Sequence, residues 1–183
     1  MLRHAPNLLS ALRLMAAPIA AWAILKDHDT LALAMFAFAG LSDLADGFVA
    51  RHWGFTSRFG AWLDPIADKL LMLFCFVALF RVGAAPFWLV ALVIARDGLI
   101  AAGAMLARMS SLPMRIEPLM IGKGSTLVQV GYVGFLLLLL AFDRDWPRLV
   151  MAAGYTVAVF AILSLAAYAQ LFLRALLSGR RIA

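Results

Sequence analysis

Six apolar stretches, each about long enough to cross a bilayer, dominate this 183-residue sequence. A spanning helix needs roughly 20 mostly apolar residues, and lipid admits only helices or closed barrels because backbone polar groups find no water there. With 65% hydrophobic residues, 14% charged residues and a mean hydropathy of +0.95, the chain is too apolar for a soluble domain of this length. We expect an all-α integral membrane protein, one domain over residues 1–183, with six transmembrane helices. Their expected ranges are 8–25, 31–50, 60–80, 86–106, 120–142 and 149–173.

The N-terminal segment, residues 1–13, is expected to lie at the membrane interface and to lead into the first span. No cleavable signal peptide is evident, so we expect this segment to be retained. Asn7, Ser10 and Arg13 are three residues apart and would therefore line one helical face. Two interpretations of Arg13 stay open: an anchor that reaches the headgroups, or a side chain that faces a ligand.

The formal charge of +6 comes from basic residues at the ends of the apolar stretches. This placement fits anionic lipid headgroups better than nucleic acid, so no nucleic-acid partner is expected. One side of a six-span arrangement collects most of the basic residues, which indicates that both termini are cytoplasmic. The residues on that side are Arg3, Arg13, Arg51, Arg58, Arg108, Arg115, Lys123, Arg174, Arg180 and Arg181.

Four aspartates gather where the second span ends and the third begins. Asp43 and Asp46 share a helical face, and so do Asp64 and Asp68, because three or four residues make about one turn. Four like charges beside a membrane repel one another and lose hydration. Divalent cations, which prefer oxygen ligands, would neutralise them. The acids therefore indicate a metal site on the cytoplasmic side.

Small residues and one arginine complete this segment. Gly47, Ala50 and Gly60 allow a bulky ligand to approach the backbone, and Arg51 offers a bidentate donor suited to phosphate. The full spacing is D-x2-D-G-x2-A-R-x8-G-x3-D-x3-D. It resembles the signature of the CDP-alcohol phosphotransferase family, membrane enzymes that build phospholipid headgroups.

The resemblance implies a CDP-linked lipid donor and Mg²⁺ or Mn²⁺ as cofactor, with two ions. It makes Asp68 the general base, close to the metals. It also implies a bacterial inner-membrane enzyme and allows a homodimer, for which no residue argues. The implied metal ligands are Asp43, Asp46, Asp64 and Asp68. The implied donor-site residues are Asp43, Asp46, Gly47, Ala50, Arg51, Gly60 and Asp64.

Candidate acceptor residues lie outside the motif. Arg96 and Asp97 occupy the middle of the fourth span, an expensive place for charge that favours a substrate-facing role over an internal salt bridge. Lys123 lies in an entry segment with glycines and hydroxyls that suits phosphate. Related enzymes carry an N-x2-[ST]-x2-R pattern like that of Asn7 and Arg13. The phosphate-binding candidates are therefore Arg96, Lys123, Arg13 and Asn7.

The acceptor itself leaves two interpretations. Several phrases, including IARD at 94–97, look like the eukaryotic-type, CMP-forming cardiolipin synthases, which use phosphatidylglycerol. The alternative is a phosphatidylglycerophosphate synthase, whose G-K-x-K-T pattern has a second lysine where this chain has Ser125. One cation fewer fits a monoanionic diester, so we favour cardiolipin synthesis. Intramembrane acids also occur in small ion-coupled transporters, although the inverted repeats common there are not visible.

Overall fold

The computed structural model describes residues 5–53, 60–109 and 119–179, and every described element is a helix. For residues 5–11, 43–53, 60–65, 108 and 175–179 it describes the helical backbone only. The all-α prediction is confirmed over this part of the chain. The helices are α1 (Ala5–Leu25), α2 (Asp29–Trp53), α3 (Gly60–Arg81), α4 (Phe87–Met109), α5 (Met120–Ala141) and α6 (Pro147–Gly179).

The expected spans agree with these helices to within a few residues, with one difference at the last helix. The N-terminal segment leads into the first span as expected, because α1 is continuous from Ala5 onward, through Pro18. The last helix extends beyond the expected 149–173, since its sequence stays apolar and contains no proline after Pro147.

Among the residues that the structure describes, three helices are long and apolar enough to cross a membrane. They are Phe87–Ala107, Met120–Ala141 and Pro147–Arg174, judged by length and composition. Over the described residues, α1 and α2 contribute shorter apolar stretches, Leu12–Leu25 and Asp29–Ser42. The arrangement with six spans remains a prediction.

The chain forms two compact units. The first unit comprises Met1–Pro86 and Val133–Trp146, and the second comprises Phe87–Tyr132 and Pro147–Ala183. Helix α5 therefore contributes to both. This division does not test the prediction of one domain over residues 1–183.

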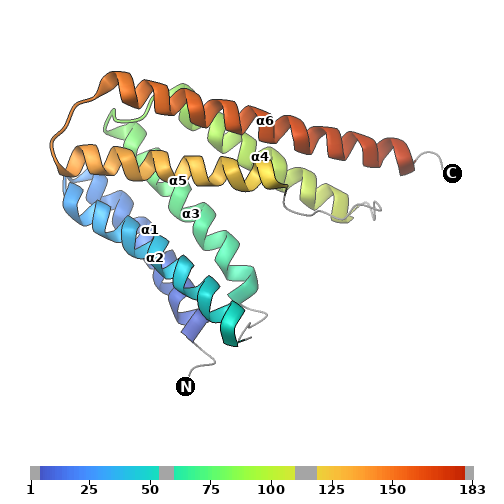
Figure 1. Ribbon diagram of the computed structural model, residues 1–183, viewed down its shortest axis with the longest axis horizontal. Coiled ribbons are helices and arrows are strands. Elements are labelled where there is room, and N and C mark those ends of the chain that lie inside the picture. The colour runs from blue at the N-terminus through green and yellow to red at the C-terminus, as the bar shows by residue number, and fades with distance from the viewer. Residues whose placement is uncertain (1–4, 54–59, 110–118, 180–183) are drawn as a thin grey trace. The chain divides into compact units, whose positions relative to one another are not determined.

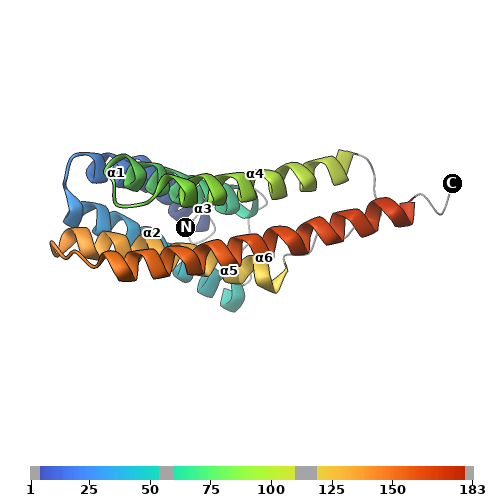
Figure 2. The ribbon, with the colours of Figure 1, turned by 90° about the horizontal axis from the view of Figure 1, so that it is seen from above.

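In the first unit, α1 packs against both α2 and α3, and the three helices can be followed in Figures 1 and 2. The buried face of α1 is built largely from alanine at helical spacing, which lets neighbouring backbones approach closely. Leucine, methionine and phenylalanine from α3 fill the remaining space. The buried residues of α1 and α3 include Ala16, Ala17, Ala20, Ala23, Ile24, Ala67, Leu71, Cys75, Phe76 and Leu79.

In the second unit, α4 and α6 pack together, with Leu89, Val93 and Val157 in the interior. Gly154 permits this approach, because a Cβ there would lie 3.3 Å from the Leu89 side chain. The outward faces of both units remain apolar. Exposed side chains such as Met15, Leu138 and Ile162 fit contact with lipid better than contact with water.

The helices α1, α3 and α5 end in the same way. Asp27, Gly83 and Asp143 follow them in the left-handed conformation, with φ of 57°, 80° and 49°. After each helix, the second residue beyond its last turn donates its N–H to a carbonyl five residues earlier, as in His28 N to Ala23 O at 2.9 Å. This is the Schellman motif, which satisfies carbonyls at a helix end. All three tight turns follow from this cap.

Candidate active site

The motif acids lie on two helices of the first unit. Asp43 and Asp46 are in the C-terminal half of α2, and Asp64 and Asp68 are in the first turns of α3. Figure 1 shows these two helix ends at the same end of the unit. The helical register that the sequence analysis required is therefore present. The side chains of Asp43, Asp46, Gly47, Ala50, Arg51, Gly60 and Asp64 lie outside the described residues, so their roles remain predictions.

Asp68 is the motif acid whose side chain the structure describes. Arg13 of α1 donates from Nη1 to its Oδ1 at 2.8 Å. The two side chains differ sharply in accessibility, with Arg13 0% exposed and Asp68 45% exposed. Arg13 was predicted as a phosphate ligand and Asp68 as the catalytic base, and the structure brings these two residues together. The side chain of Asn7, the other candidate on α1, lies outside the described residues.

Arg96 occupies a buried position on α4, with only 4% of its surface exposed. Its Nη1 contacts Asp97 Oδ1, and its Nη2 donates to Ser164 Oγ on α6. Its Nε has no hydrogen-bond partner among the described residues. The guanidinium therefore belongs to an internal polar network and still has one donor to offer.

Two polar residues near the start of α5, Lys123 and Ser125, lie in different environments although they are only two positions apart in the sequence. Lys123 is exposed, whereas Ser125 is fully buried and accepts a hydrogen bond from Gln129 Nε2 at 3.2 Å. Ser125 and Gln129 lie on the packed stripe of the helix. The comparison of Ser125 with the second lysine of the G-K-x-K-T pattern treated position 125 as accessible beside Lys123. In the structure, a side chain at position 125 does not lie on that accessible surface.

Tyr168 of α6 fixes this entry. Its hydroxyl accepts the N–H of Leu119 at 3.2 Å, just before α5 begins. A Cβ added at Gly122 would meet the same hydroxyl at 3.0 Å, so glycine is needed for the close approach. Tyr168 thus satisfies a backbone group at the helix start and sets the position of the turn that carries Lys123.

The sequence analysis missed Ser164, Tyr168 and Gln129. The sequence did contain a signal for them, namely polar residues at helical spacing within apolar helices. Ser164 and Tyr168 are four residues apart, as are Ser125 and Gln129, so each pair shares a helical face. Polar pairs at this spacing inside an apolar stretch indicate an internal network.

The donor chemistry of the motif fits a hard divalent cation. Carboxylate oxygens are the ligands that Mg²⁺ and Mn²⁺ prefer, and four come from two helix ends at helical spacing. Within the described side chains, no three His, Cys, Asp or Glu residues cluster closely enough to hold a metal. The expected ligand set therefore remains a prediction based on the residues of the motif.

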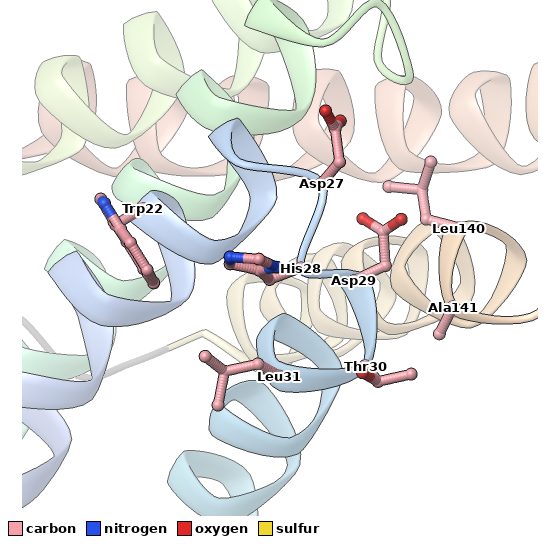
Figure 3. Close-up of a pocket in the computed structure, with 8 residues that line it drawn as sticks. All are labelled: Trp22, Asp27, His28, Asp29, Thr30, Leu31, Leu140 and Ala141. Carbon is pink, nitrogen blue, oxygen red and sulfur yellow. The ribbon is translucent and has the colours of Figure 1, made fainter.

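A hollow of about 590 Å³ lies at the other end of the first unit, at the turn between α1 and α2. Figure 3 shows Asp27, His28 and Asp29 at this turn, with Leu140 and Ala141 of α5 beside them. The His28 ring lies 5.5 Å from that of Trp22. Because α2 starts here and carries the motif near its far end, this hollow is separate from the motif.

A sequence model of the CDP-alcohol phosphatidyltransferase family matches residues 3–170, which is most of the chain. The chain belongs to this family. The expected resemblance is confirmed, and the match supports the expected class of enzyme, a phosphatidyltransferase. Members of the family generally depend on a divalent metal.

Similar proteins carry two different names. A probable cardiolipin synthase (CMP-forming) of Drosophila melanogaster is 34% identical over 145 residues, covering 70% of this chain and 45% of that protein. The cardiolipin synthase (CMP-forming) of Rattus norvegicus is 36% identical over 141 residues, covering 68% and 47%. A chloroplastic CDP-diacylglycerol–glycerol-3-phosphate 3-phosphatidyltransferase of Oryza sativa is 34% identical over 157 residues, covering 76% and 48%. The chain thus spans about half the length of these relatives.

Proposed function

We propose that this chain transfers a phosphatidyl group from CDP-diacylglycerol to phosphatidylglycerol, giving cardiolipin and CMP. An acceptor hydroxyl oxygen attacks the phosphorus that carries the diacylglycerol group. A new phosphorus–oxygen bond forms, and the bond to CMP breaks, so CMP leaves with the electron pair. The acceptor proton passes to a base. The family match and the two cardiolipin synthases support this reaction class.

Asp68 is the proposed base. Its carboxylate is partly exposed and held by Arg13, so it combines access with a fixed anchor. A positioned carboxylate can accept a proton as the oxygen attacks, which is worth a factor of roughly 10² to 10⁴ in rate. The small residues of the motif would leave room for the cytidine diphosphate: Gly47, Ala50 and Gly60. Arg51 would bind its phosphate groups.

Asp43, Asp46 and Asp64 would hold two Mg²⁺ or Mn²⁺ ions, with Asp68 near or among the ligands. Bound there, the ions would supply positive charge to the diphosphate oxygens. The remaining work is positioning and charge stabilisation, as expected for transfer to phosphorus.

The acceptor site is proposed to include Arg96 and Lys123. The Nε of Arg96 has no hydrogen-bond partner within the part of the chain that the structure describes, and Lys123 is exposed at the start of α5. Ser125 is fully buried and bonded to Gln129, so it does not line the surface that carries Lys123. The two cardiolipin synthases, at 34% and 36% identity, support phosphatidylglycerol as acceptor.

The alternative acceptor is glycerol 3-phosphate, which would make the chain a phosphatidylglycerophosphate synthase. The rice relative, at 34% identity, favours this candidate. The donor site and the metal chemistry are the same in both. Family membership leaves the transporter hypothesis without support.

The proposed setting is a bacterial inner membrane with six spans, cytoplasmic termini and the motif facing the cytoplasm. The soluble part of the donor would then reach the site while the acyl chains stay in the bilayer. A homodimer is compatible with the apolar outward faces.

The test is an assay of purified protein in lipid with labelled CDP-diacylglycerol. Phosphatidylglycerol and glycerol 3-phosphate are offered in parallel, with Mg²⁺, and CMP and lipid products are measured. We expect CMP release with cardiolipin as the main product. Turnover of glycerol 3-phosphate alone would reverse the order of the two acceptors, and no CMP release with either would refute the proposed reaction.

A further inference from the structure

The bond between Arg13 and Asp68 links a fully buried arginine to the proposed base. The two residues lie 55 positions apart in the sequence, on α1 and α3, and Nη1 and Oδ1 are 2.8 Å apart. Arg13 was expected either to anchor the chain at the headgroups or to bind phosphate. A guanidinium that is 0% exposed and already bonded to a carboxylate suits neither role well.

The packing of α1 on α3 sets this bond. Arg13 precedes Ala16 and Ala17 by one turn, so it continues the buried alanine stripe of α1. Asp68 directly follows the buried Ala67 on α3 and precedes Leu71 by one turn. The small side chains let the two helices approach, and their register then places the arginine opposite the acid.

Arg13 and Asp68 differ in burial, and this difference indicates which of the two can contact a substrate. A charge removed from water needs a compensating partner, and the Asp68 carboxylate supplies one to Arg13. Asp68 is 45% exposed, so part of its side chain is accessible to another molecule. The arginine is thus the fixed half of the pair, and the acid is the half that can meet another molecule.

We propose that Arg13 is the positioning residue of the reaction: it holds Asp68 in the orientation in which this carboxylate accepts the acceptor's proton. The inference rests on the proposed function, because it assigns Asp68 the role of base. Arg13 itself touches neither substrate. Its removal should therefore slow the chemical step and leave the binding of both substrates nearly unchanged.

The first experiment uses Arg13→Met and Arg13→Lys in the full-length protein. Methionine has similar length and no charge, and its partner Asp68 can be hydrated, so the fold should survive. We expect Arg13→Met to lower kcat by about 10-fold to 100-fold, with KM for donor and acceptor within about threefold. Arg13→Lys should recover part of kcat, since it restores one donor. Elution as a single species in detergent checks the fold.

The second experiment combines Arg13→Met with Asp68→Asn. If Arg13 acts through Asp68, its loss should cost little once the carboxylate is gone, so the double variant should match Asp68→Asn within about twofold. Arg96→Met is the matched control, because it removes another buried arginine, one that bonds to Asp97 and Ser164. Its effect should multiply with that of Asp68→Asn. Long incubations with labelled CDP-diacylglycerol measure the slow turnover of the variants that lack the Asp68 carboxylate.

The outcomes separate the two proposals. Equal cost of Arg13→Met with and without the Asp68 carboxylate overturns the positioning role, and so does a raised KM for the acceptor with unchanged kcat, which would make Arg13 a substrate ligand. Both results leave the proposed reaction intact. Absence of CMP release from the wild-type protein, with either acceptor, refutes the reaction and with it the role of Arg13.

Discussion

The two buried arginines illustrate how similar sequence contexts lead to different surroundings. Arg13 and Arg96 both lie in apolar helices and both contact an aspartate. Arg13 pairs with a distant acid on another helix, and that acid belongs to the family motif. Arg96 pairs with its own neighbour, Asp97, and reaches a serine on α6. The first unit therefore links its arginine to the proposed chemistry, and the second links its arginine to helix packing.

This difference indicates a division of labour. Asp68 remains 45% exposed beside Arg13, whereas Asp97 is 21% exposed beside Arg96. We infer that the α1–α3 unit carries donor binding and proton transfer. We propose that the unit of α4, α6 and the first part of α5 holds the acceptor groups within its polar network. Each prediction below changes one unit and asks whether the other is affected.

The largest effect is expected from the motif acids. Asp43→Asn or Asp64→Asn should reduce CMP release to background, because neutral amides replace carboxylate ligands poorly. The matched change in the other unit, Asp97→Asn, should cost no more than about tenfold, the worth of one modest interaction. Initial rates with Mg²⁺ measure both, and a chelator should stop the wild-type protein. Full activity in chelator, or an equal loss from Asp97→Asn, would break the comparison.

The next effect concerns Ser125. From the sequence alone, Ser125→Lys should improve glycerol 3-phosphate use by up to about tenfold, as one exposed charge would. The buried environment of Ser125 changes this expectation. An unpaired charge there should destabilise the second unit by about 3 kcal/mol or more, seen as early thermal unfolding in detergent.

Lys123→Gln provides the matched change at the same helix entry. Because Lys123 is exposed, stability should stay within about 0.5 kcal/mol. Acceptor turnover should fall roughly tenfold if the lysine contacts phosphate. A stable Ser125→Lys protein that gains glycerol 3-phosphate activity would contradict the buried position and favour the alternative acceptor.

Much of this division could be predicted from the sequence, and the reasons are physical. Helix ranges followed from apolar stretches because lipid leaves the backbone no other choice, and the motif followed from fixed spacing. Pairing between helices could not be predicted in this way. Arg13 meets Asp68 only through the register of α1 on α3, and Ser125 is buried on the face of α5 that also carries Gly122, which approaches Tyr168 of α6 closely. Such facts depend on packing, which spacing within one helix does not specify.

A smaller effect tests the packing of the second unit. Gly122→Ala should destabilise the protein by about 1 kcal/mol, since the new Cβ meets the Tyr168 hydroxyl that holds Leu119. Gly131→Ala is the control in the same helix, because a Cβ there meets nothing within 4 Å. It should be neutral or stabilise by up to about 1 kcal/mol. Melting temperatures compare the two, and equal shifts would argue against the tight contact.

The smallest effect lies in the turns of the first unit. Asp27→Gly and Asp143→Gly should each stabilise by about 0.5 to 1 kcal/mol, because glycine adopts left-handed φ without strain. Gly83→Ala should destabilise the protein by a similar amount, because alanine is strained at the left-handed φ of Gly83. A steric clash does not contribute, since a Cβ at Gly83 meets no neighbour within 4 Å. CMP release should not change in any of these variants. A change in turnover would show that the turns affect the Arg13–Asp68 pair, and it would contradict the separation of the turns from the proposed chemistry.

The Schellman caps also bear on how the chain enters a membrane. Each cap ends a helix and begins a short turn into the next helix, from α1 into α2, from α3 into α4 and from α5 into α6. Unpaired carbonyls are costly to carry through hydrocarbon, and the caps pair several of them inside the turn. In the proposed six-span arrangement, each of these turns would cross the bilayer or reach its surface with several carbonyls already paired. The caps would then lower the free-energy cost of inserting the chain into the membrane, in addition to fixing the turns of the folded protein.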